Sequence, residues 1–146
     1  MRITILPSGD GDFAPARPAS IYDINQLRMN SVVIEHEGET LNLELNLAEW
    51  TISLTKLLKA AIEHGSASLS EMNSFAGETF EGEALAFNTV ILDVYDWKKK
   101  ERFKLQLDWD NALRLHQHMT EALEHVLRTS ELSLNEVGDS HLIRMQ

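Results

Sequence analysis

The feature of this sequence that most constrains its fold is an apolar period that changes from two residues to a helical one without a break. Leucine alternates with polar residues from Leu41 to Leu47, which is typical of a strand with one buried face. Asn46, followed three residues later by Glu49, has the spacing of a capping box. The sequence therefore predicts a strand that runs directly into a helix over residues 47–64.

The same unit recurs further along the chain. A shift of 62 residues places residues 41–46 on 103–108, with apolar positions on apolar positions and one cap on the other. A second helix is expected over 109–128, capped by Asp108 or Asp110. An internal repeat explains the match. The general likeness of strand–helix junctions explains it as well.

A β-hairpin is predicted before the first helix. Apolar residues also alternate around Ile34, and Gly38-Glu39 suits a two-residue turn with glycine first. That turn would pair Ile34 with Leu43 and keep the apolar residues of both strands on one face.

A second hairpin is predicted before the second helix, with its first strand over residues 84–96. A turn at Lys98-Lys99 would pair Val94 with Phe103. The same register would pair Asp93 with Lys104 and Tyr95 with Arg102 on the other face, where opposite charges are mildly favourable.

The remaining elements complete an α+β fold within a single domain, residues 1–146. Strands are expected over 2–6, around 67–72 and near Phe80, and residues 8–20 have the glycine, proline and aspartate of a loop. Two antiparallel meander-plus-helix halves result, roughly ββββα twice, at residues 2–65 and 66–128, with a polar tail at 130–146. The expected core includes Trp50, Leu54, Leu57, Ile62, Leu105, Leu107, Met119 and Val126.

Composition excludes several functions. The 146 residues include 23 acidic and 13 basic side chains, a net charge of −10. Nucleic acids and anionic membranes require positive charge, so neither is expected as a partner, whereas a basic protein is. The absence of cysteine excludes disulfides and thiolate zinc sites. No apolar run is long enough to span a membrane, and no signal peptide is recognised, so the cytoplasm is the expected location.

Metal and catalytic motifs are weak. His118, Glu121 and His125 share one helix face, but a solvated polar face explains them more simply than zinc. The acidic loop Gly9–Asp12 lacks the spacing of a calcium site. No carboxylates form a recognisable acid–base pair. We therefore expect no metal, no cofactor and no catalytic residue, and hence no enzyme.

A protein-binding surface is the stronger prediction. The outward face of the second hairpin mixes aromatic and charged residues, as interface hot spots do, unless the second helix or the tail covers it. The first hairpin carries an acidic rim of Glu35, Glu37, Glu39 and Glu44, which a solvated face with no partner would also explain. The predicted partner-binding residues are Glu35, Glu37, Glu44, Asp93, Tyr95, Trp97 and Arg102.

The element order resembles the Whirly fold, in which a helix follows each of two antiparallel sheets. Plant Whirly domains bind single-stranded DNA through a KGKAAL motif. The nearest basic run here, residues 98–102, does not match it, so DNA binding is not carried over. The order, the small size and the acidity also resemble immunity proteins of contact-dependent growth inhibition and related polymorphic toxin systems. The resemblance covers most of the chain.

This resemblance implies a cytoplasmic immunity protein that binds a cognate protein toxin, a basic nuclease, and occludes it stoichiometrically. An acidic inhibitor would associate rapidly with a basic toxin. The alternatives are a small interaction adaptor or chaperone-like domain and, third, an enzyme without a recognisable motif.

Overall fold

The computed structural model describes residues 1–7, 29–72 and 79–129, so the predicted loop over 8–20 and tail over 130–146 lie outside the described residues. The described part is a single α+β domain, as predicted. Its elements are β1 (Arg2–Pro7), β2 (Met29–His36), β3 (Glu39–Asn46), α2 (Leu47–His64), β4 (Ser66–Met72), β5 (Thr79–Leu85), β6 (Thr89–Asp96), β7 (Glu101–Asp108) and α3 (Trp109–Thr129).

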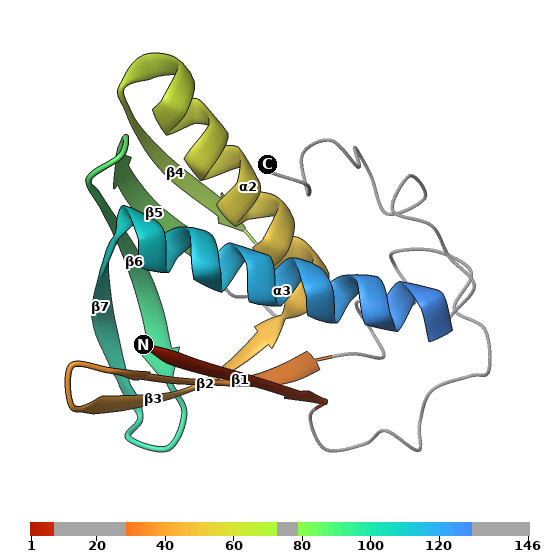
Figure 1. The fold of residues 1–146 in the computed structure, drawn as a ribbon. Helices are drawn as coiled ribbons and strands as arrows, with labels where there is room; N and C mark the ends of the chain where they lie inside the picture. The colour runs from red at the N-terminus through yellow and green to blue at the C-terminus, as the bar shows by residue number, and fades with distance from the viewer. Residues whose placement is uncertain (8–28, 73–78, 130–146) are drawn as a thin grey trace.

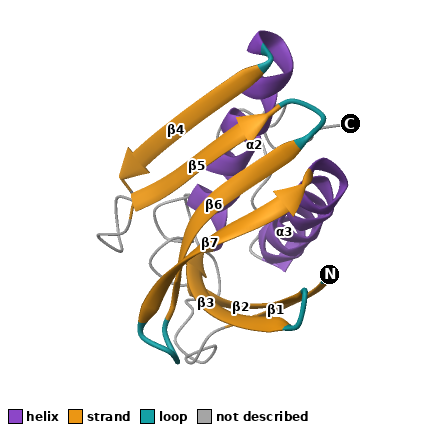
Figure 2. Cartoon of the chain, turned by 90° about the vertical axis from the view of Figure 1, so that its left-hand side faces the viewer, coloured by secondary structure: helices purple, strands orange, loops and turns teal. Residues whose placement is uncertain are grey.

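The strands form two antiparallel sheets, one of order β1-β2-β3 and one of order β4-β5-β6-β7. Both helices lie behind the four-stranded sheet in Figure 2. In Figure 1 the three-stranded sheet runs across the lower end of the four-stranded sheet. One helix follows each sheet in the chain, which is the predicted order of meander and helix. The sheet of β4–β7 therefore has one face packed on helices and one face that neither helix covers.

The junctions between strand and helix are built as the sequence predicts. The Asn46 side chain accepts a hydrogen bond from the backbone N of Glu49 at 3.2 Å, and Gly65 N donates to Ala61 O at 2.7 Å where α2 ends. Asp108 rather than Asp110 caps α3, since its Oδ1 accepts from Asn111 N at 2.8 Å. Both caps bond the N–H three residues on, so the 62-residue correspondence extends to atomic contacts.

The predicted register of the first hairpin is wrong by two residues. Ile34 pairs with Leu41, not with Leu43, and the turn is Glu37-Gly38. Both turn residues have positive φ, 51° and 80°, which matches the twist of a two-residue hairpin turn. A shift of two leaves each side chain on its face, so the predicted burial of Ile34, Leu41 and Leu43 is nevertheless correct.

The predicted register of the second hairpin is confirmed, with Val94 opposite Phe103 and Tyr95 opposite Arg102. The single strand predicted over 84–96 is wrong, because a turn interrupts it. Residues 86–88 connect β5 to β6, with Phe87 at a φ of 60°. Apolar residues on both sides of this turn obscured it in the sequence.

The core joins both sheets to both helices. Six members of the expected core are buried, namely Trp50, Leu54, Leu57, Leu105, Leu107 and Met119. Ile62 is 45% exposed, which contradicts the prediction, because in the last turn of α2 the neighbouring Ala61 faces the core instead. The side chain of Val126 lies outside the described part of the structure.

Two contacts hold α2 in its position. Gly82 allows β5 to approach the helix, since a Cβ there would lie 2.7 Å from Leu57 Cδ2. On the other side, Thr55 Oγ1 and His116 Nε2 lie 2.6 Å apart in the buried interface between α2 and α3. Helix packing thus buries the inner face of the four-stranded sheet, and neither helix covers the outer face.

Candidate partner-binding surface

The candidate surface is the outer face of the sheet β4–β7, together with the adjoining edge of β3. Along β6, Val90, Leu92 and Val94 point inward and are fully or almost fully buried, and the alternate residues point outward. Figure 2 looks onto this outer face, and neither helix lies over it. The alternative that the second helix covers this face is therefore wrong. The other possible cover, the tail over 130–146, lies outside the described residues.

A groove of about 220 Å³ opens where β3 of the smaller sheet meets β6 and β7. Its lining combines the buried side chains of Leu45, Trp50 and Val94 with polar side chains at the surface. Four of the predicted partner-binding residues line it together: Glu44, Asp93, Tyr95 and Arg102. Residues from both predicted hairpins thus meet at one site, which the sequence could not indicate.

Asp93 and Arg102 form the charged part of this groove. Arg102 Nη1 lies 3.4 Å from Asp93 Oδ1, diagonally across the β6–β7 ladder. The Asp93 side chain is 13% exposed and that of Arg102 is 61% exposed. A long ion pair with one solvated member contributes little to folding. Both groups can therefore change partners at little cost in stability.

Two aromatic side chains flank the groove and the hairpin tip. Tyr95 is 45% exposed and lines the groove, opposite Arg102 in the ladder. Trp97 is 44% exposed and lies just beyond β6, with Lys98 Nζ 5.5 Å from the centroid of its ring. Half-exposed aromatic side chains beside charged ones give an interface both apolar area and orientation.

The acidic residues of the first hairpin do not form one cluster. Glu35 lies opposite Thr40, which is four positions from Glu44 on β3, a separation of about 13 Å along a strand. Glu35 and Glu37 are exposed near the turn, whereas Glu44 lines the groove. Glu39 is paired with Lys99 at 3.4 Å. Of the acidic rim, only Glu44 lines the groove with Asp93, Tyr95 and Arg102.

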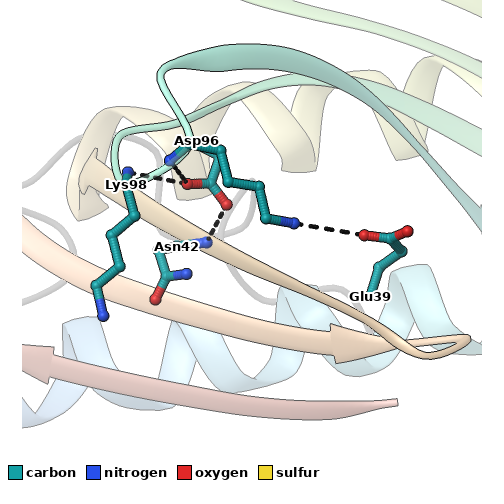
Figure 3. A network of polar contacts seen from close by, with 5 residues as sticks. Glu39, Asn42, Asp96 and Lys98 are labelled. Carbon is teal, nitrogen blue, oxygen red and sulfur yellow. Dashed lines mark hydrogen bonds and ion pairs between the residues drawn. The ribbon is translucent and has the colours of Figure 1, made fainter.

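A joint that the sequence did not predict ties the β6–β7 hairpin to β3. Asp96, which is fully buried, accepts hydrogen bonds from the backbone N of Lys98 and Lys99 at 2.9 and 2.8 Å and from Asn42 N on β3 at 3.0 Å (Figure 3). Trp97 N also donates to Asn42 O at 3.1 Å. The tip of the β6–β7 hairpin is thereby fixed to the edge of β3.

Electrostatics in this joint favour an ionised carboxylate. Burial of Asp96 acts to raise its pKa, but the hydrogen bonds from the backbone of Lys99, Asn42 and Lys98 outweigh burial and lower it. The local part of the joint had a sequence signal, since aspartate favours turns in which it bonds the backbone two or three residues on. The bond to Asn42, 54 residues away, had none.

The described residues include no cluster of three or more histidine, aspartate or glutamate side chains that could hold a metal ion. His118 Nδ1 lies 2.8 Å from Arg114 O, so this ring is engaged with its own helix. Within the same residues, no helix combines the length and the apolar composition needed to cross a membrane.

No protein-family model matches this chain, and searches of curated proteins and of solved structures gave no match either. Function is therefore inferred from the surface itself.

Proposed function

We propose that this chain is a protein-binding module whose partner docks on the groove formed by Glu44, Asp93, Tyr95 and Arg102. The observation that carries the proposal is the meeting of these four residues at the face of the four-stranded sheet that neither helix covers. A groove with buried apolar side chains, a half-exposed tyrosine and exchangeable charges suits a partner side chain better than a small-molecule reaction.

Charge indicates the kind of partner. Glu81 and Glu83 on β5 add negative charge to the same outer face, against which Arg102 and Lys104 are the exposed cations of β7. The whole chain carries −10. A basic protein would be attracted over long range by this charge and oriented by the face.

The resemblance to immunity proteins gives this partner a role. We propose that the chain is a cytoplasmic immunity protein and that the partner is a basic nuclease toxin, whose substrate groove an acidic surface can fill in place of a phosphate backbone. Inhibition would be stoichiometric and would need no catalytic residue. The acidic, aromatic groove supports this role.

The test uses the toxin domain encoded beside the gene. Wild-type chain should form a one-to-one complex with it and restore growth when the two are co-expressed. Tyr95→Ala should accelerate dissociation, at a typical hot-spot cost of about 2 kcal/mol or more. Trp97→Ala tests whether the hairpin tip belongs to the same interface.

A charge reversal, Glu44→Lys, tests the acidic part of the groove, and its matched control is Glu63→Lys. Glu63 is an exposed residue near the end of α2, 13 residues after the groove residue Trp50, which is about 20 Å along the helix. Both changes alter the net charge equally, so only Glu44→Lys should accelerate dissociation. Equal effects of the two variants, or no neighbouring toxin that binds, would contradict the proposal.

A further inference from the structure

The free edge of β4 is the one sheet edge of the described structure that nothing protects. β4 ends the order β4-β5-β6-β7, and Figure 2 shows no described element beyond it. Exposed strand edges pair with other chains unless charge, proline or a covering element prevents it. The seven residues of β4 include no lysine, arginine or proline. Its single charge, Glu71, is neutralised by Lys56 at 3.3 Å.

The other three edges differ from β4. β7 has Arg102 and Lys104 exposed along its length, and β1 ends in Pro7, which has no N–H to donate. The edge of β3 is bonded at Asn42 by Asp96 and Trp97. Among the described edge strands, β4 is therefore the one that is open to pairing with another strand.

The backbone of β4 is oriented for pairing. Gly65 O accepts from Ala86 N at 2.9 Å, and bonded residues alternate along an antiparallel pair. Ala67 and Leu69 therefore bond toward β5, and Ser66, Ser68 and Ser70 turn their N–H and C=O groups toward the open edge. Met72, the last residue of β4, turns the same way, and the three serines have small side chains, which allow a second strand to approach closely.

We propose that a second copy of this chain occupies this edge, with the two β4 strands antiparallel about a twofold axis at Leu69. This register uses all seven residues of each strand and keeps both faces aligned. On the outer face it places Ser68 opposite Ser70 of the second copy. On the helix side it places Leu69 opposite Leu69 of the second copy.

Self-complementarity is the reason for choosing a second copy over another partner. In this register no charged side chain lies opposite one of like sign, because Glu71 faces Ala67 of the second copy. The result is a continuous eight-stranded sheet whose outer faces join across the axis. The dimer does not depend on the proposed function, because the groove at β3, β6 and β7 lies away from β4.

The test is the mass of the full chain in solution, by sedimentation equilibrium over a range of concentrations. Wild type should approach twice the 16.6 kDa of one chain. Because each copy carries −10, added salt should tighten the dimer. S68K/S70K places lysine opposite lysine twice in the dimer and should weaken it by about tenfold or more.

Two further variants make the test specific. S68K/S70E has the same substitution sites but places lysine opposite glutamate, so it should remain dimeric. S68P removes one outward N–H that the monomer does not use, so it should be a folded monomer. Circular dichroism and melting establish that each variant folds. A monomeric wild type, a dimeric S68K/S70K or a monomeric S68K/S70E would overturn the proposal.

Discussion

At the scale of single residues, His116 is held in one protonation state by its surroundings. Thr55 Oγ1 donates its only proton to Thr51 O at 2.7 Å, so at the 2.6 Å contact with His116 it must accept from Nε2–H. Nε2 therefore carries a proton, and the charge of the ring depends on its pKa. Burial, aided by the charge of Lys59, lowers its pKa from 6.5 to about 4.

This lowered pKa predicts a specific pH dependence of stability. Unfolded His116 takes up a proton below about pH 6.5, whereas the folded ring resists protonation down to about pH 4. The stabilisation is therefore complete above pH 6.5 and is lost as the pH falls through this window, by about 3 kcal/mol. Urea unfolding at pH 7 and pH 4.5 should reveal the loss in wild type. His116→Gln keeps a donor for Thr55 but cannot titrate, so equal losses in both proteins would contradict this.

At the scale of elements, the β6–β7 hairpin depends on Asp96 for its attachment to β3. Asp96→Asn replaces one acceptor oxygen with a donor that faces backbone N–H groups, and it removes the charge that strengthens those bonds. We expect a loss of about 2–3 kcal/mol in the free energy of unfolding. The amides of Asn42, Lys98 and Lys99 should exchange hydrogen faster.

The matched control is Asp108→Asn at the cap of α3. Asp108 also ends a strand and accepts a backbone N–H, but it uses only Oδ1, and asparagine caps helices as well as aspartate does. Its free energy of unfolding should change little. If the two variants were equally stable, the joint between the sheets would not depend on the second oxygen of Asp96.

At the scale of the whole molecule, charge should act on the encounter with the proposed basic partner. Reversing Glu35, Glu37 and Glu44 to lysine changes the net charge from −10 to −4, so association should slow and its salt dependence should flatten. The positions of the three residues separate the effect on association from the effect on dissociation. Glu35→Lys/Glu37→Lys should change association alone, whereas Glu44→Lys should also speed dissociation, because only Glu44 lines the groove. Binding kinetics across a salt series measure both rates, and unchanged rates in the triple variant would exclude steering by this hairpin.

Local chemistry in the sequence determined the elements and their faces. The bounds of α2 and the register of the second hairpin follow from caps, periodicity and turn residues that act within a few positions. The same local signals could not distinguish registers of the first hairpin that differ by two residues, because a period of two leaves every face unchanged. The positive φ of Glu37 and Gly38, which selects between them, is a property of the folded turn.

Tertiary structure alone decided where the elements meet. The groove residues Glu44 and Asp93 come from different sheets, and the bond from Asn42 to Asp96 spans 54 residues. Nothing in a local pattern encodes such a distance, since it results from packing both helices against one face of the four-stranded sheet. The sequence thus specified which side chains would point outward, and the packing of the core decided which of them became neighbours.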